Sequence, residues 1–476
     1  MNIKTCHLPF NKTPPATHVS KLQNLSVPTL SYDLRKVFND QSKPHFVQDP
    51  TTLAYNLDYR LHDISHCKRF DFSKLAPFVK PSKDEKLRSS AAKHDCKFYA
   101  STSSITSILQ ILQLSWGTWL LNTNRFSERL QSHSRKFTSQ FSKVHAIDLK
   151  YDSDHNVYGI DSGQSSSTTI LSDVGHSLEK FLTSTPEEFS RHLSDESTLG
   201  HVKDSPNSNM VEDNDLSFHY SKLHGFLLRA QLDCIDPSLP KKTFDLKTRG
   251  TVALRFTQDL EYAKDYKIKS LKGYFESFER EDYDLLRSML LKYGLQSRIG
   301  NMDGILVAYH NVYNIFGFQY FSQEKIDNWV YGNSDRAKVC FDLSLRILKW
   351  TLEQVIDKYP KENLRILYIK GSKPRQMRFV IVPEDADRTR CFTITCNQKK
   401  REKSVIHPLS EWKDMEDMSM DVSIKEDSRA EGMDIVKTFE LHSIFDIKYP
   451  SIYFKSAYGS YLNEQLPKDD LETWRM

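Results

Sequence analysis

The sequence lacks several features that would assign it to a class at once. A membrane-spanning helix needs about 20 consecutive apolar residues, and the chain of 476 residues contains no such run. Glycine and proline are scarce, with 16 and 18 residues, and no internal repeat is found. This composition excludes collagen-like and other low-complexity architectures. It favours a folded protein with its own core, which a hydrophobic content of 38% and an aromatic content of 12% support.

Paired cysteines and a strong net charge are also missing. The seven cysteines are odd in number and scattered, and none forms a Cys-x-x-Cys pair, so free thiols in a reducing compartment are expected and a structural zinc site has little support. The 66 basic and 62 acidic residues nearly cancel, to a net charge of +4. Any basic surface for nucleic acid must therefore be local.

The N-terminal region has no apolar core of a secretory signal. It has no acidic residue before Asp33 and carries Lys4, Lys12 and Lys21, but no arginine precedes Arg35. This pattern is compatible with a mitochondrial presequence and equally with a disordered tail.

An uncharged run at Phe98–Asn124 is the nearest approach to a membrane helix. Ile105, Leu109 and Leu112 recur at helical spacing, but serine, threonine and glutamine interrupt the run. We expect a helix buried on most sides, capped by hydroxyls of the Ser-Thr-Ser-Ser sequence at 101–104.

Composition and periodicity divide the chain into five segments within an α/β (α+β) fold. A hairpin is expected at 144–161, and a long helix is expected from Asp335 to Tyr359, where Pro360 ends it. The predicted segments are a tail or presequence (1–44), a helical and hairpin elaboration (45–165), a core (166–330) with a mobile insertion (194–216), a long helix plus strands packed on the core (331–400), and a charged loop with a C-terminal segment (401–476).

The stretch Phe226–Phe256 predicts two strands that each have an apolar and a charged face. If the strands pair as a hairpin, Asp233 comes near Asp245 and Lys247. Two carboxylates held close together repel, so one gains a proton or both bind a cation. An aspartate pair with a neighbouring lysine is the minimal apparatus of a magnesium-dependent phosphodiesterase, and the alternative is a solvated sheet face with a salt bridge.

The order of elements around this stretch resembles the core of the PD-(D/E)XK nucleases. The predicted order is a helix near 171–183, strands near 218–234 and 243–250, a helix near 279–293 and a strand near 303–309. The resemblance implies a mixed sheet flanked by helices and a motif formed by Asp233, Asp245 and Lys247. A glutamate on the preceding helix usually completes that motif, and Glu179 is the best candidate.

This resemblance implies a role for each candidate site residue. The ligands of Mg²⁺ or Mn²⁺ would be Asp233, Asp245, the Leu246 carbonyl and Glu179. Lys247 would orient water or neutralise the developing oxyanion, with a pKa that falls on partial burial. The substrate-binding candidates are Arg229, Gln231, Arg249 and Arg298; for Arg229 and Arg249 ion pairs are the alternative, and for Gln231 a strand hydrogen bond.

A wider resemblance covers roughly residues 45–395. Six runs look like the fungal mitochondrial "Pet" (petite) membrane-associated proteins: 97–109, 175–180, 228–240, 244–249, 274–281 and 299–311. This family acts in 5′-end processing and degradation of mitochondrial RNA. The resemblance implies single-stranded RNA as substrate, attack from the 5′ side, a place on the matrix side of the inner membrane with peripheral association, and other RNA turnover proteins as partners. It implies no dinucleotide.

Two hypotheses of different class follow. The first is a metal-dependent ribonuclease, and the second is a non-catalytic, membrane-associated RNA-binding adaptor in RNA turnover or translation that keeps the nuclease fold. The intact set of Asp233, Asp245 and Lys247 favours the first, because a binder does not need two carboxylates close to a phosphate.

Overall fold

The computed structural model describes residues 3–10, 17–19, 26–116, 119–138, 143–163, 170–194, 217–257, 263–401, 403–404, 412 and 415–445. From residue 195 onward the insertion predicted at 194–216 lies outside the described residues. The same is true of residues 446–476.

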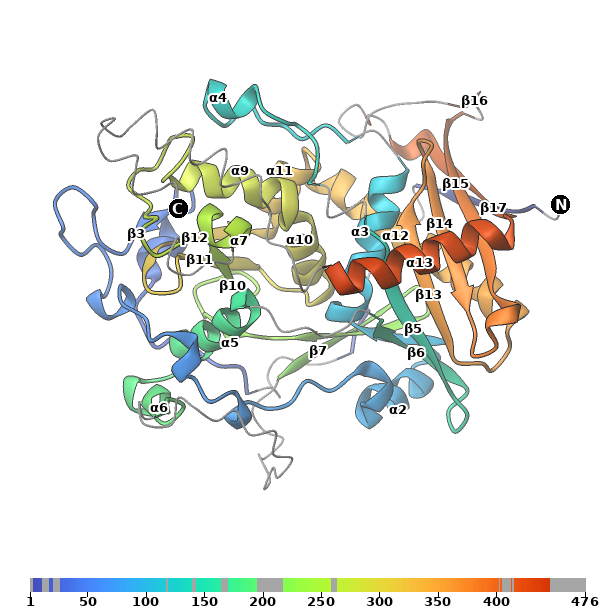
Figure 1. The fold of residues 1–476 in the computed structure, drawn as a ribbon, viewed down its shortest axis with the longest axis horizontal. Coiled ribbons are helices and arrows are strands. Elements are labelled where there is room, and N and C mark those ends of the chain that lie inside the picture. Colours follow the sequence, from blue (N-terminus) through green and yellow to red (C-terminus); the bar gives the residue numbers. More distant parts are fainter. Residues whose placement is uncertain are drawn as a thin grey trace.

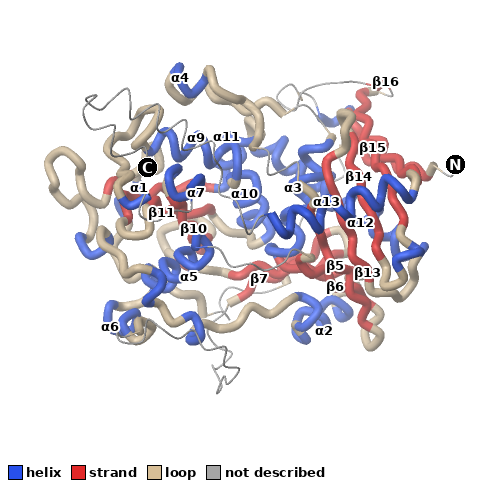
Figure 2. Tube along the Cα trace, in the orientation of Figure 1, coloured by secondary structure: helices blue, strands red, loops and turns tan. Residues whose placement is uncertain are grey.

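Two β-sheets with helices around them form the described part of the chain (Figure 1, Figure 2). The large sheet is mostly antiparallel, but β4 pairs in parallel with both β6 and β8, so the sheet is mixed. In spatial order its strands are β1 (Lys4–Pro9), β17 (Met418–Glu426), β15 (Arg390–Lys400), β14 (Gln376–Val382), β13 (Leu364–Lys370), β5 (His145–Asp152), β6 (Val157–Ser162), β4 (Phe98–Ser101), β8 (Phe226–Gln231), β7 (Phe218–Leu223) and β2 (Thr17–His18), with β16 (Lys403–Ser404) beside β15. The predicted mixed α/β fold is confirmed.

The small sheet carries the residues of interest. Its strands, in spatial order, are β3 (His45–Phe46), β12 (Ile315–Ser322), β11 (Gly304–His310), β10 (Thr243–Gly250) and β9 (Cys234–Ile235). Parallel strands need a crossover connection. Helices α9 (Phe278–Ser288) and α10 (Leu290–Ile299) lie between the parallel strands β10 and β11 in the sequence and supply it.

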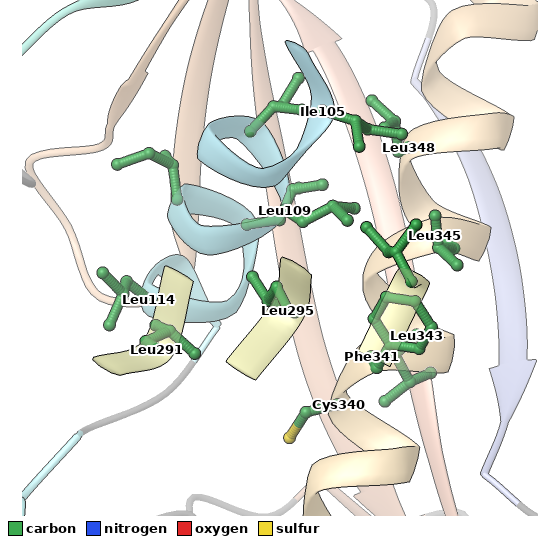
Figure 3. Packing of buried hydrophobic residues seen from close by; sticks show 14 of the residues in the cluster. Ile105, Leu109, Leu114, Leu291, Leu295, Cys340, Phe341, Leu343, Leu345 and Leu348 are labelled. Atoms are coloured by element: carbon green, nitrogen blue, oxygen red, sulfur yellow. The ribbon is translucent and has the colours of Figure 1, made fainter. Parts of the chain in front are cut away.

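Three helices form the centre of the larger core. α3 (Thr102–Ser115) packs against α10 and α12 (Ser334–Lys358), and Figure 3 shows Leu109 and Leu295 in this contact. α3 is buried around nearly its whole circumference, as its uncharged sequence predicts. The Asn333 side chain caps α12 by accepting the Arg336 N–H at 2.9 Å, and the helix ends before Pro360, as expected.

The other helices cover the faces and ends of the sheets. α2 packs on the large sheet, and α5 packs on β10 of the small sheet. The bounds are α1 (Arg35–Asn39), α2 (Glu85–Lys93), α4 (Glu128–Gln131), α5 (Ile170–Thr183), α6 (Pro186–Ser190), α7 (Val252–Thr257), α11 (Gln323–Val330) and α13 (Arg429–Phe445); short 3-10 helices lie at Tyr59–Leu61, Cys67–Arg69, Phe72–Lys74, Pro81–Lys83, Ala386–Arg388 and Met415–Asp417.

The predicted hairpin within Phe226–Phe256 is wrong. β8 belongs to the large sheet, where it pairs with β4 and β7, and β10 belongs to the small sheet. Only the two residues of β9 pair with the start of β10. The chain changes sheets at Leu232 and Asp233, so the stretch joins two sheets.

Parts of the predicted tail (1–44) and of the predicted charged loop and C-terminal segment (401–476) form strands of the large sheet. Residues 4–9 pair along β17, and Phe10 is buried against Trp412 with ring centroids 5.0 Å apart. β17 itself alternates buried apolar and outward polar residues, a pattern that the acidic composition of 411–434 conceals. The large sheet takes strands from all five segments predicted from the sequence.

Candidate active site

The crossing between the two sheets positions Asp233. β8 ends at Gln231, and two residues of β9 follow Asp233. Because β9 is so short, β10 has a free edge beyond Phe244, where no strand of the described residues pairs with it. Asp233 Oδ2 accepts a hydrogen bond at 3.1 Å from the Leu246 N–H on that edge. The carboxylate therefore replaces the backbone acceptor that a longer β9 would supply.

Asp245, Lys247 and Arg249 share one face of β10, because side chains alternate along a strand. Lys247 Nζ lies 2.7 Å from Asp245 Oδ2 and 4.0 Å from Asp233 Oδ2. The two aspartates are 4% and 8% exposed, and the lysine side chain is 19% exposed. The structure thus brings together the three motif residues through a carboxylate–backbone contact, although the sequence analysis expected strand pairing.

The electrostatics of this cluster are those of a crowded anionic site. Burial raises the pKa of Asp233 well above its ordinary value, and the charges of Glu179 and Asp245 raise it further. Burial alone would lower the pKa of Lys247, but Asp245 and Asp233 outweigh it and raise that pKa. The expected fall of the Lys247 pKa is therefore wrong, and the lysine is a charged partner of the carboxylates at neutral pH.

Glu179 reaches the cluster from α5. Val174, Leu178 and Leu182 form the buried face of this helix, which packs on β10. Glu179 follows Leu178, and its Oε1 lies 3.5 Å from Gln231 Nε2, which donates to it. Burial raises the pKa of Glu179 to about 7; the Lys247 charge opposes this shift and the Asp245 charge adds to it. Glu179 and Gln231 therefore belong to the same site as the motif residues.

The donor set fits a hard divalent cation. The buried carboxylates of Asp233 and Asp245 both lie within 4.0 Å of Lys247 Nζ, and burial together with the neighbouring negative charges raises the pKa values of Asp233 and Glu179, so a bound cation would offset a crowded negative charge. The N–H and C=O of one strand residue point to the same edge, so the Leu246 carbonyl faces the edge where Asp233 binds. Among the described residues, no three His, Cys, Asp or Glu side chains approach closely enough to hold one ion. Glu179 accepts a hydrogen bond from Gln231 and interacts with Asp233, Asp245 and Lys247 through charge.

A basic inner wall lies beside the carboxylates. Arg249 is 5% exposed; its Nε lies 3.5 Å from Glu281 Oε2, the ion pair kept open as the alternative, and its Nη2 has no hydrogen-bond partner. Burial and the neighbouring Arg255 lower its pKa to about 10. Sequence reasoning missed Lys292 and Tyr293 of α10: the pKa of Lys292 is lowered by burial and by Lys247, and the Tyr293 ring centroid lies 5.5 Å from Lys247 Nζ. Lys292 and Tyr293 come close to Lys247 only because α10 is part of the connection that crosses from β10 to β11.

Two predicted substrate-binding arginines are engaged elsewhere, which corrects their assignment. Arg229 is 3% exposed, pairs with Asp84 and donates to the Val79 carbonyl at 2.7 Å. Arg298 Nη2 lies 2.5 Å from Asp327 Oδ1. Both guanidinium groups hold structural elements together, which for Arg229 is the ion pair kept open as the alternative.

Three aromatic residues on β11 and β12 belong to the core and are not base-stacking groups. Tyr309, His310 and Tyr320 are fully buried. The Tyr309 hydroxyl donates to Asp282 Oδ1 at 2.6 Å, and the Tyr320 hydroxyl donates to Asp303 Oδ2 at 2.8 Å. They cannot meet a nucleic acid in this fold.

The fold and the cluster define a mixed α/β protein whose small sheet carries a buried carboxylate–lysine site at a free edge. The family model described as "Mitochondrial protein Pet127" matches residues 78–356, more than half of the chain. The chain belongs to the Pet127 family, which confirms the wider resemblance to the fungal mitochondrial Pet proteins.

Two relatives place the family in fungal mitochondria. The chain is 32% identical over 403 residues to the "mRNA degradation protein pet127, mitochondrial" of Schizosaccharomyces pombe, covering 82% of this chain and 74% of that protein. It is 37% identical over 270 residues to the "Putative mitochondrial translation system component PET127" of Saccharomyces cerevisiae, covering 54% of this chain and only 30% of that protein. Within the described residues, no helix has the length and apolar character needed to cross a bilayer.

Among solved structures, two of Scheffersomyces stipitis Rai1 align over most of both chains. One, with (3′-NADP)+ and calcium ion, covers 80% of this chain and 94% of its own at 9% identity. The other covers 90% and 95% at 11% identity. Both have a TM-score of 0.34, so no argument rests on them.

Proposed function

We propose that this chain is a divalent-metal-dependent ribonuclease with a PD-(D/E)XK-type core, acting in the processing and degradation of mitochondrial RNA. The observation that carries the proposal is the buried Asp233–Asp245–Lys247 cluster on the free edge of β10. The order α5, β10, α9–α10, β11 around the cluster supports it. RNA as the substrate rests on the family, in which one relative is named an mRNA degradation protein.

Asp233, Asp245, the Leu246 carbonyl and Glu179 would hold Mg²⁺ or Mn²⁺, since these hard cations prefer oxygen ligands. When bound, such a cation supplies Lewis-acid stabilisation of the charge that develops on the phosphate.

Side chains around the proposed cation site would carry out the other catalytic roles. Lys247 donates hydrogen bonds to the attacking oxygen or to the developing oxyanion, and its compact charge suits that role. Burial raises the pKa of Glu179 to about 7, so its carboxyl group would lose a proton near neutral pH to bind the cation. The Gln231 amide orients the Glu179 carboxyl group. Arg249 and Lys292 supply positive charge beside the phosphate.

The finer parts of the proposal rest on the family resemblance. They are attack on single-stranded RNA from its 5′ end, a place on the matrix side with peripheral contact to the inner membrane, and action alongside other RNA turnover proteins.

The test compares purified wild type with Asp245→Asn on RNA labelled at the 5′ or the 3′ end, with Mg²⁺ or with a chelator. Asp148→Asn, which alters an outer ion pair with Arg365, is the matched control. We expect Asp245→Asn to lose at least about 100-fold in cleavage rate while it binds RNA as well or better, because a negative charge leaves the phosphate site. Identical products from both proteins would favour the non-catalytic adaptor, and cleavage by the wild type that persists with the chelator would refute the metal dependence.

A further inference from the structure

A segment at residues 72–83, here called the strap, passes beside the candidate site with its apolar side chains facing solvent. Phe78 is 63% exposed, Val79 is 40% exposed and Phe72 is 36% exposed. Large apolar side chains gathered on a surface often mark an interaction site. Lys74, Lys80 and Lys83 alternate with them and are also exposed.

The strap is held in place at both ends. At one end the Asp71 N–H bonds to the His192 carbonyl at 2.8 Å, and Lys74 Nζ donates to the Arg191 carbonyl at 2.7 Å. At the other end Pro81 is buried and Ser82 donates two hydrogen bonds to Asp161. The exposed side chains therefore project from a fixed backbone, which lowers the entropy cost of binding a partner.

The charge of the strap is positive. Asp84, directly after it, is paired with Arg229, and Asp71, directly before it, binds Ser73 and Lys74. The nearby carboxylates are thus already engaged, and Lys80 and Lys83 present their charge to solvent.

Contacts connect the strap directly to the site. Arg229 of β8 donates to the Val79 carbonyl, and Gln231, two residues further on the same face of β8, donates to Glu179. Two residues of a strand span about 7 Å, roughly one nucleotide step along an extended strand. Figure 1 shows this part of the chain in blue, running between α6 and α2 on the side of the molecule where α5 lies.

We propose that the strap is a track for single-stranded RNA leading into the site, on which Phe78 stacks with a base while Lys80 and Lys83 contact phosphates. This inference rests on the proposed function, since it assigns a path to the same substrate. Exposed aromatic side chains interleaved with lysine are the usual means of binding single strands without sequence preference. The position of the strap beside Gln231 and Glu179 favours RNA over a lipid surface.

The test measures binding of a fluorescein-labelled 12-nucleotide RNA by anisotropy, with every substitution placed in the Asp245→Asn protein so that no cleavage interferes. We expect Phe78→Ala to weaken binding by roughly 5- to 100-fold, the loss of one base–aromatic stack, and Phe78→Trp to restore it. Tyr59→Ala is the control, because Tyr59 is 66% exposed at another place on the surface. An oligomer with abasic sites throughout has no base to stack on Phe78. Its affinity should therefore be the same for the Phe78→Ala protein and for the protein that keeps Phe78.

The contribution of Lys80 and Lys83 is measured by the salt dependence of RNA binding. The double substitution Lys80→Gln and Lys83→Gln removes two phosphate contacts and should reduce the slope of log K against log salt by about 1.4. An unchanged slope would overturn their assignment to phosphates.

The outcomes separate the strap from the nuclease. If wild type cleaves RNA but Phe78→Ala binds RNA normally, the strap proposal fails alone. If neither wild type nor any variant cleaves RNA but Phe78→Ala still weakens RNA binding, the strap proposal is supported and the ribonuclease proposal fails. If Phe78→Ala loses binding only to vesicles of phosphatidylcholine with cardiolipin, the strap is a lipid contact and the proposal is overturned.

Discussion

The buried Glu179 carboxyl group of the candidate site is expected to lower the free energy of unfolding of the protein when it is ionised. Its pKa is about 7 in the folded protein and about 4.5 in an unfolded chain. Between these two pH values the folded state keeps a proton that the unfolded state has lost, so the free energy of unfolding falls as the pH rises. Below pH 4.5 both states are protonated, and above pH 7 both are ionised and the cost is constant.

The size of the effect follows from the two pKa values. A difference from about 4.5 to about 7 corresponds to roughly 3 kcal/mol, at 1.36 kcal/mol for each pH unit. Glu179 is partly exposed, so this is an upper figure. The entropy of unfolding scales with length, so for a chain of 476 residues each kcal/mol moves Tm by about 1 °C. Glu179→Gln removes the ionisation and keeps an acceptor for Gln231.

The assay is metal-free thermal unfolding of wild type and Glu179→Gln at pH 4.5 and pH 8. We expect the variant to match wild type at pH 4.5 and to unfold up to about 3 °C higher at pH 8. Millimolar Mg²⁺ should raise the wild-type Tm at pH 8 more than that of the variant, because the ion binds only the folded, ionised site. Glu187→Gln, on the exposed first turn of α6, is the control and should show no such pH dependence. A variant less stable than wild type at pH 8, or a difference independent of pH, would refute the reasoning.

Three further substitutions test the site and the fold. Lys247→Met should lower the single-turnover cleavage rate by on the order of 100-fold, and Lys247→Arg should not restore it, because a planar guanidinium cannot take the place of a compact ammonium group. Leu109→Ala should destabilise the protein by about 2–5 kcal/mol in urea unfolding, whereas Leu53→Ala, at a side chain that is 64% exposed, should stay within about 0.5 kcal/mol. Arg229→Met should cost about 3–5 kcal/mol in urea unfolding, because the mostly buried Asp84 carboxylate loses its cation; a cost within about 0.5 kcal/mol would refute the structural role of this ion pair.

Site residues that are close together in the sequence could be predicted from it, whereas those contributed by distant segments could not. Asp233, Asp245 and Lys247 lie within fifteen residues of one another, and strand alternation alone groups two of them on one face. Local pattern also identifies α5, α12 and the β5–β6 hairpin, because their apolar periods are complete within each segment.

The errors concern partners far away in the chain. β8 was expected to pair with β10, but its neighbour β4 lies more than 120 residues earlier, and no local pattern reports such a pairing. The role of Arg229 depends on Asp84, which is 145 residues away, and Lys292 joins the site only through the crossover over β10. In each case the role of the residue depends on a tertiary contact, and the sequence around the residue does not indicate that contact.

The pairing of β1 with β17 has a consequence for the order in which the protein forms. Lys4 lies opposite Ile424, so one edge of the large sheet joins segments that are synthesised some 420 residues apart. At roughly 5–20 residues per second, β1 waits tens of seconds after synthesis for the strand that covers its backbone. Contacts of such long sequence separation slow folding, and during that interval Phe10 lacks the Trp412 ring against which it packs. The large sheet is therefore completed last at the edge where β1 pairs with β17.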